Sequence, residues 1–174
     1  MSHLKFRRMT ACFVYASLLL ASSVSAYAAE PEMDEDDKEW HEVALQLPEA
    51  PKPENLINFY KSGSQSFAID TKSLTVASDG TVRYTLIATS SGGAKNISYE
   101  GIRCQSYEVK LYAFGRADGS WSRSRRNQWT DISNRGVNTQ HSTLFTDYFC
   151  DGRSVAGKLN TLLDRLRGKK APYS

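Results

Sequence analysis

The sequence predicts one α+β domain, in which a twisted antiparallel β-sheet carries two helices from the C-terminal part of the chain. Between Phe67 and Ile132, apolar residues alternate with polar ones in short runs separated by turn-forming residues, as in half-buried strands. After His141 the apolar residues recur every three to four positions, which indicates helices. A run of strands followed by helices at one end of the chain is typical of the α+β class.

The N-terminal residues predict export. A basic start (Lys5, Arg7, Arg8), an apolar run over 9–20 and small residues ending at Ala28 form the pattern of a secretory signal. We favour cleavage after Ala28 over cleavage after Ala26. An uncleaved membrane anchor is the alternative, but the apolar run is shorter than the roughly 20 residues that a spanning helix needs. We therefore expect a secreted protein, in the periplasm, that is not transmembrane once the signal is removed.

Charge divides the rest of the chain into an arm, a domain and a tail. Residues 29–54 contain ten acids and two lysines, whereas the residues from Asn55 onward contain nine acids and seventeen bases. We expect a disordered acidic arm over 29–39, the α+β domain over 40–168 and a basic tail over 169–174. The arm is either a solvated spacer, which we favour, or a segment that lies back on the basic face.

The expected strands begin at Val43, where apolar residues alternate through Leu47. Pro48, Pro51 and Pro53 then indicate an extended stretch outside any strand ladder. Further strands are expected over 67–70, 74–76, 81–90, 96–104, 107–115 and 121–132, with turns at 78–80, 90–93 and 116–119.

Two helices are expected after the strands. Residues 142–150 place apolar side chains four apart, which favours a short helix. Residues 154–168 place Val155, Leu159, Leu162, Leu163 and Leu166 on one helical stripe. Ser154 is the expected N-cap and Gly168 the expected residue just past the C-terminal end.

Cys104 and Cys150 are the two cysteines that remain after cleavage of the signal. In an oxidising compartment two cysteines most simply form a disulfide, which we favour over a reactive thiol at Cys104. Strict alternation would separate Ile97 and Tyr99 from Ile102 and Cys104, so we predict a β-bulge at Gly101 that returns all four to the core face. Ser98, Glu100 and Arg103 would then share the opposite face as a candidate functional face.

Catalytic and metal-binding motifs are missing from the sequence. There is no G-x-S-x-G, H-E-x-x-H or C-x-x-C motif, and the mature histidines, His41 and His141, are expected to be surface or capping residues. His141 and Asp147 would lie on opposite sides of a helix, and the acidic run at 32–37 lacks the glycine and distal glutamate of a calcium loop. We expect no catalytic residues, no metal and no cofactor.

A basic stretch near the end of the sheet is a candidate anion-binding site. On a regular strand, Trp121, Arg123 and Arg125 would share one face, with Arg116 close by, and arginines beside aromatic rings bind anionic groups. Charged side chains also protect sheet edges from aggregation, which is the simpler interpretation. The compartment and the absence of net charge in the mature chain disfavour nucleic acid. An unknown envelope protein or an anionic envelope component is the partner we expect.

Several stretches together resemble a known family: residues 45–60, residues 79–104, residues 112–121 and residues 147–150. They are similar to the CNP-one-like family of small exported proteobacterial proteins, over about Glu39 to Leu166. The resemblance implies an exported domain from a Gram-negative bacterium, and it supplies no catalytic residues. Cys104, Cys150 and the run from Ser98 to Gly101 match the family pattern.

From the sequence we therefore expect a non-enzymatic periplasmic domain with an accessory or binding role in the cell envelope. One alternative is an enzyme of unrecognised type that acts on an anionic envelope substrate, with Glu100 and Arg103 as its best candidates. A second alternative is a binder of anionic lipid or glycan through Arg116, Arg123 and Arg125.

Overall fold

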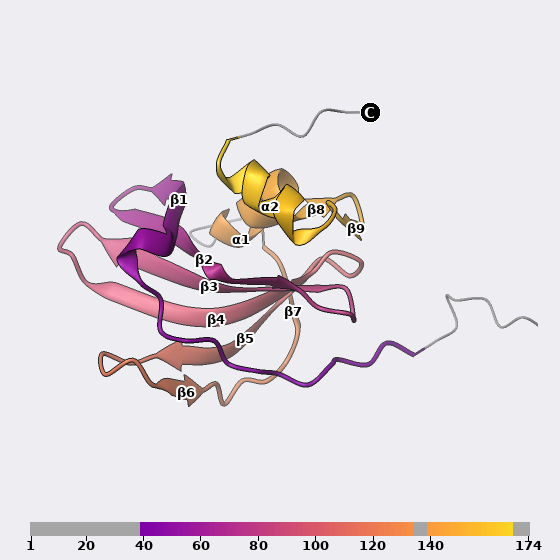
Figure 1. Ribbon diagram of the computed structural model, residues 1–174, viewed down its shortest axis with the longest axis horizontal. Helices are drawn as coiled ribbons and strands as arrows, with labels where there is room; N and C mark the ends of the chain where they lie inside the picture. The colour runs from indigo at the N-terminus through magenta and orange to yellow at the C-terminus, as the bar shows by residue number, and fades with distance from the viewer. Residues whose placement is uncertain (1–38, 134–138, 169–174) are drawn as a thin grey trace, which may run out of the picture. The chain divides into compact units, whose positions relative to one another are not determined.

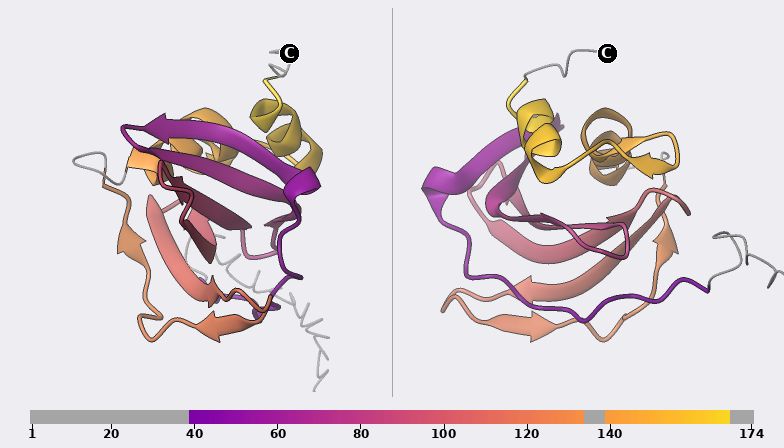
Figure 2. Two further views of the ribbon diagram at one scale, coloured as in Figure 1. Left: turned by 90° about the vertical axis from the view of Figure 1, so that its left-hand side faces the viewer. Right: turned by 45° about the vertical axis from the view of Figure 1, so that its right-hand side comes forward.

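The structure is a computed structural model, and it describes residues 39–133 and 139–168. Seven strands form one antiparallel sheet in the order β1-β2-β3-β4-β5-β6, with β7 also paired to β5. Their bounds are β1 Leu56–Ser62, β2 Gln65–Val76, β3 Thr81–Ser90, β4 Lys95–Arg103, β5 Glu108–Gly115, β6 Trp121–Arg123 and β7 Thr130–Asp131. The sheet is strongly curved (Figures 1 and 2). The α+β prediction is confirmed.

The C-terminal part of the chain covers one face of the sheet, which we call the helix face (Figure 1). It consists of α1 (Thr139–Thr143), the π-helical turn η3 (Leu144–Phe149), a small hairpin of β8 (Cys150–Asp151) and β9 (Ser154–Val155), and α2 (Leu159–Leu166). The main core lies between these elements and the sheet. Its fully buried members are Ile69, Leu74, Val82, Tyr84, Ile102, Cys104, Leu144, Phe149 and Leu162.

The predicted helices are present, but one begins later than expected. Ser154 lies in β9, and α2 begins at Leu159 after Lys158 as its N-cap, so the predicted N-cap is wrong. Gly157, with φ +135°, and the β8–β9 hairpin separate Val155 from the helical stripe. Gly168 follows the C-cap with φ +74°, a left-handed backbone that glycine adopts without strain, and its predicted place is confirmed.

The first expected strand does not exist. Residues 39–52 pair with no strand; they run in an irregular, extended path across the face of the sheet opposite to the helices (Figure 2). We call residues 40–50 the strap and the face that they cover the strap face. Leu45 and Leu47 of the strap pack against a second apolar cluster, which contains Tyr99, Tyr112, Ala113, Trp121 and Trp129.

The strands at the two edges of the sheet also differ from the prediction. A short 3₁₀ turn, η2 (Pro53–Asn55), leads into β1, an edge strand that the sequence did not indicate. The single strand expected over 121–132 is two short pieces, β6 and β7, joined by residues outside any ladder. The predicted signal, most of the predicted acidic arm and the predicted basic tail lie outside the described residues.

Within the described ranges, no helix has both the length and the apolar character required to cross a membrane.

Candidate functional site

The predicted disulfide is present and joins the end of β4 to the end of η3. Cys104 and Cys150 are bonded with their Cα atoms 5.7 Å apart, and both are buried in the main core. The bond therefore ties the helical layer to the sheet at one point of close packing.

The predicted bulge at Gly101 is wrong. Strand β4 pairs with β3 in unbroken register from Lys95 to Arg103, and the extra residue of the β4–β5 pair is Tyr112, on β5. Gly101 is needed for close approach instead, because a Cβ atom there would lie 2.8 Å from the hydroxyl oxygen of Tyr112. Side chains along β4 therefore alternate strictly between the two faces.

This alternation changes the candidate functional face. Ser98 and Glu100 lie on the helix face with Ile102 and are buried, while Arg103 lies on the strap face with Tyr99. The three residues predicted to share one face are therefore divided between two faces. Arg103 pairs with Glu108 at 3.1 Å, and its guanidinium carbon lies 3.6 Å from the ring centroid of Trp40.

Glu100 is the centre of a buried polar cluster on the helix face. Its carboxylate accepts hydrogen bonds from Ser98 Oγ at 2.6 Å and from Tyr84 Oη at 3.1 Å, and it lies 2.7 Å from Nε2 of His141. His141 belongs to α1, so the prediction of a surface or capping histidine is wrong. No local pattern in the sequence indicates this contact, because the two residues are 41 positions apart.

Electrostatics in this cluster favour an ion pair. Burial by itself raises the pKa of the Glu100 carboxyl, but the charge and hydrogen bond of His141, with the bonds from Ser98 and Tyr84, outweigh burial and lower it. Burial by itself lowers the pKa of the His141 imidazole. The charge and hydrogen bond of the Glu100 carboxylate outweigh burial and raise that pKa. Burial and the adjacent Glu100 carboxylate raise the pKa of the Tyr84 hydroxyl, so Tyr84 remains a donor.

The geometry of this cluster differs from that of a catalytic triad. In a triad the hydroxyl donates to the imidazole, and the carboxylate orients the imidazole from the other side. Here the Ser98 hydroxyl donates to the carboxylate, and so does the hydroxyl of Tyr84. The cluster fixes α1 on the sheet through a charged pair with satisfied hydrogen bonds.

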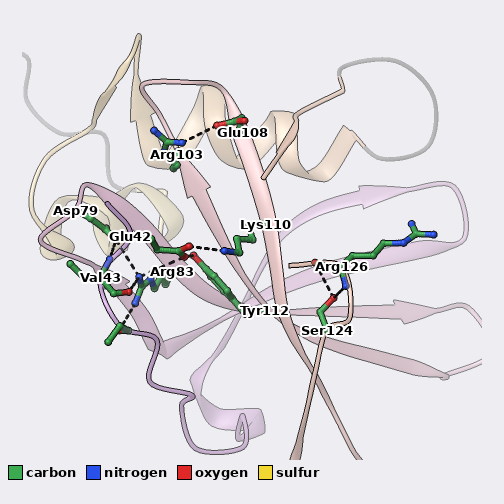
Figure 3. Close-up of polar contacts among 11 residues, drawn as sticks. Glu42, Val43, Asp79, Arg83, Arg103, Glu108, Lys110, Tyr112, Ser124 and Arg126 are labelled. Carbon is green, nitrogen blue, oxygen red and sulfur yellow. Dashed lines mark hydrogen bonds and ion pairs between the residues drawn. The ribbon is translucent and has the colours of Figure 1, made fainter. Parts of the chain in front are cut away.

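A second charged cluster holds the strap on the sheet (Figure 3). Arg83, 5% exposed, donates to the carbonyl oxygens of Val43 at 2.7 Å and Ala44 at 3.2 Å. The carboxylate of Glu42 accepts from Lys110 Nζ and from Tyr112 Oη, each at 2.6 Å. Side chains thus supply the attachment that a strand ladder would otherwise give.

Asp79 completes this cluster at the start of the strap. Its carboxylate accepts from the backbone N–H of Val43 at 2.8 Å and pairs with Arg83 at 3.2 Å, while its carbonyl oxygen accepts from Trp40 Nε1. Burial alone raises the pKa of Asp79, and the N–H groups of Val43 and Thr81 outweigh it, so the pKa is lowered. The strap is therefore bound through ionised side chains.

The predicted anion-binding residues lie at the β6 edge of the sheet, but they do not share one exposed strand face. Trp121 is covered by the strap: its ring packs against Tyr99, and its Nε1 donates to the carbonyl oxygen of Pro48 at 2.7 Å. Strand β6 ends at Arg123, so Arg125 lies in the following loop and shares no regular strand face with it. The Trp121 ring, which the sequence suggested as an aromatic partner for bound anionic groups, is therefore already covered by the strap.

Four exposed arginines remain at this edge: Arg116, Arg123, Arg125 and Arg126, which we call the arginine edge. Within the part of the chain that the structure describes, none of them has an acidic partner within 4 Å. The nearby carboxylate of Asp118 accepts from the hydroxyl and the N–H of Ser120. In Figure 3 the side chain of Arg126 extends away from the charged cluster of the strap.

An exposed aromatic ring lies beside the arginine edge. Phe114, 42% exposed, pairs with Ser122 across β5 and β6, and Ser122 Oγ accepts from Arg116 at 3.2 Å. The sequence did not single out Phe114, because a phenylalanine within an alternating strand is expected to be buried. The arginine edge therefore combines exposed guanidinium groups with an accessible aromatic ring. That ring is Phe114, whereas the sequence predicted Trp121.

Two cavities lie elsewhere on the domain. One of about 500 Å³ is bounded by Trp40, Arg103, Arg153 and the disulfide end of β4, and another of about 430 Å³ by Lys52, Lys72 and Asp70. Neither is lined by Glu100 or His141. Among the described residues, no group of three or more His, Cys, Asp or Glu side chains is placed to hold a metal ion.

These features define a small disulfide-bridged α+β domain with a side-chain-held strap and an exposed cationic edge. The chain belongs to the CNP1-like family, whose model matches residues 35–167. The resemblance seen in the sequence is thereby confirmed. No curated protein and no solved structure matches the chain significantly.

Proposed function

We propose that this protein is exported to the periplasm of a Gram-negative bacterium and serves there as a non-enzymatic accessory protein that binds an anionic envelope component. The observation that carries the proposal is the arginine edge: four exposed arginines without an ion-pair partner among the described residues, beside the exposed ring of Phe114. Guanidinium forks of this kind bind phosphate or carboxylate oxygens in pairs.

Two features support export. The sequence carries the pattern of a cleaved secretory signal, and the domain contains a buried disulfide, a bond that forms and persists in oxidising compartments.

Backbone geometry adds donors to the same edge. Arg116 donates its N–H to Ser120, and Ser124 donates its N–H to Tyr112, each with an N–O distance of 2.8 Å. In an antiparallel ladder this register directs the N–H groups of Trp121 and Arg123 away from β5, toward the outer edge. An anionic group at the edge would therefore meet both guanidinium and backbone donors.

The enzymatic alternative has weaker support in the geometry. A carboxyl group that acts as a general acid at neutral pH needs a raised pKa and access to substrate. The pKa of Glu100 is lowered, the carboxylate is bonded to three side chains, and Arg103 lies on the other face of the sheet.

The binding proposal is tested with the mature chain, residues 29–174, and vesicles of equal parts phosphatidylglycerol and phosphatidylcholine. Replacing Arg116, Arg123, Arg125 and Arg126 by Gln should weaken binding at 0.05 M NaCl on the order of a thousandfold, because each basic residue near an anionic surface contributes about 1 kcal/mol. A matched variant with Gln at Lys52, Lys61, Lys72 and Lys95 removes the same charge from other exposed positions. Equal loss of binding in both variants would contradict the proposed site.

A second probe separates a lipid from a glycan. Polygalacturonate, a soluble carboxylate polymer, presents anionic groups without a membrane. Binding to vesicles alone supports a lipid headgroup, and binding to the polymer alone supports a glycan. Binding to neither at 0.05 M NaCl would refute the proposed function.

A further inference from the structure

A cavity of about 430 Å³ lies where the end of the strap and η2 meet strand β2. Its wall carries two carboxylates, Glu49 and Asp70, and two ammonium groups, Lys52 and Lys72. Within the described ranges, none of these four side chains has an oppositely charged group within 4 Å. The cavity therefore presents two charges of each sign that a bound ligand can pair with.

Asp70 is the deepest of the four charged residues. It is 2% exposed, whereas Glu49, Lys52 and Lys72 are exposed. Its Oδ1 accepts a hydrogen bond from the backbone N–H of Lys72 at 3.2 Å, and its Oδ2 accepts none within the part of the chain that the structure describes. Because buried carboxylates are normally paired with a cation or with several donors, Asp70 has unused acceptor capacity.

A second buried polar group lies beside this carboxylate. Thr85 is directly opposite Asp70 in the register of β2 and β3, and residues in this relation have Cβ atoms about 4.5–5.5 Å apart. The Thr85 hydroxyl is buried and has no hydrogen-bond partner among the described residues. A buried polar group that lacks a protein partner commonly has a bound water or ion instead. An ammonium group, which has several N–H donors, can satisfy both oxygens.

Hydrogen bonds hold the walls of the cavity in place. On the strap, the carbonyl oxygen of Pro48 accepts from Trp121 Nε1 at 2.7 Å. At η2, the carbonyl oxygen of Asn55 accepts from Thr71 Oγ1 at 3.0 Å. A site with fixed walls avoids the cost of ordering its segments when a ligand binds.

We propose that this cavity binds a small zwitterion, a free amino acid or a dipeptide, with its ammonium group on Asp70 and its carboxylate between Lys52 and Lys72. The depth of Asp70 and the exposure of the two lysines set this orientation. A simple anion would meet the carboxylates of Asp70 and Glu49, and a simple cation would meet the lysines, so a ligand with both charges is favoured. The volume suits such a ligand, since small-molecule sites begin at about 300 Å³. No residue of the arginine edge lines the cavity, so this site does not depend on the proposed function.

Binding is tested by titrating the ¹⁵N-labelled mature chain with L-alanine and with L-alanyl-L-alanine. In the millimolar range, at least one probe should shift the side-chain amide signal of Asn55 and the backbone signals of Lys72 and Ser73, which line the cavity. The N-acetylated form of that probe lacks the ammonium group and the C-amidated form lacks the carboxylate, so each should bind at least about tenfold more weakly. No shift with either probe, or equal affinity for one of the modified forms, would overturn the proposal.

Two variants assign the charges. Asp70→Asn preserves the size of the side chain and removes its charge, and the double variant Lys52→Gln with Lys72→Gln changes only exposed residues, where substitutions leave the fold intact. Each should weaken binding of the probe on the order of tenfold or more. The matched control, Lys61→Gln with Lys95→Gln, changes exposed lysines outside the cavity and should leave the affinity unchanged. Equal affinity in the two lysine variants would refute the site, even if Asp70→Asn fails to fold.

Discussion

The carboxylate of Glu100 and the imidazole of His141 meet 2.7 Å apart between the sheet and the first helix. Because both groups are mostly buried and the carboxylate has two further donors, the pair joins α1 to β4 through charge as well as packing. Stability should therefore depend on pH with a sign that follows from the two pKa shifts.

The pH dependence has two limbs. The pKa of His141 is raised in the folded state, so its contribution is complete below the ordinary value of 6.5 and disappears as the pH rises through the folded pKa. The pKa of Glu100 is lowered, so its contribution is complete above the ordinary value of 4.5 and disappears as the pH falls through the folded pKa. The pair should stabilise most between these two ordinary values.

His141→Gln should accordingly lower the free energy of unfolding by about 2 kcal/mol near pH 5.5, and by less than about 1 kcal/mol above pH 8, because glutamine keeps a donor but not the charge. Urea denaturation of both proteins across this pH range measures the difference. A difference that is the same at every pH would contradict a charged pair.

Gly101→Ala should destabilise the domain by about 1–3 kcal/mol, because the new methyl group would collide with the Tyr112 ring and with Thr81. Gly92→Ala is the matched control, since the nearest atom to its methyl group would be Ser90 Oγ at 3.9 Å. Thermal unfolding of the two variants distinguishes close packing from a general effect of losing glycine. Equal midpoints of thermal unfolding for the two variants would show that β4 and β5 can move apart at little cost in free energy.

Arg83→Met should release the strap. The change removes the donors to the carbonyl oxygens of Val43 and Ala44 and leaves Asp79 without its cation, at a cost of about 3 kcal/mol. We expect faster proteolytic cleavage within residues 40–50, while the disulfide-linked core persists. Arg123→Met, at an exposed arginine, should change stability by less than about 0.5 kcal/mol. Equal protection of the strap in both variants would contradict its attachment through Arg83.

Replacing Cys104 and Cys150 together by Ser should lower the free energy of unfolding by about 4 kcal/mol, since the bond closes a loop of 46 residues in the unfolded chain. Denatured, unreduced mature protein should contain no free thiol. Two thiols per chain in that assay would show that the bond between Cys104 and Cys150 is absent.

The sequence predicted an element of the fold correctly where a single local pattern determines that element. Alternation predicted the strand from Thr81 to Ser90, and glycine in the left-handed region at Gly80 fits the predicted turn. The sequence predicted a strand where the strap lies, because the alternation of Val43, Leu45 and Leu47 shows that one side of this segment is apolar. The alternation does not show whether the backbone is hydrogen-bonded to another strand. Its partners are side chains 36 to 73 residues away, which no local pattern indicates.

The error at Gly101 has a different cause. The predicted bulge assumed that all apolar residues of β4 face one core, whereas Tyr99 belongs to the cluster under the strap and Ile102 to the core under the helices. A strand with apolar clusters on both faces needs no break in its alternation. The same assumption places Glu100 on the face away from the helices, so the sequence predicts no contact with His141, a residue 41 positions away.

Titration of the ¹⁵N-labelled mature chain with phosphatidylglycerol headgroup, supplied as glycerophosphoglycerol and then as small vesicles, tests the arginine edge most directly. The account predicts that the Nε–Hε signals of Arg116, Arg123, Arg125 and Arg126 change at 0.05 M NaCl and return at 0.5 M NaCl, while those of Arg83 and Arg103 stay fixed. Changes confined to Arg103 and Arg153, or no change at any arginine, would contradict it.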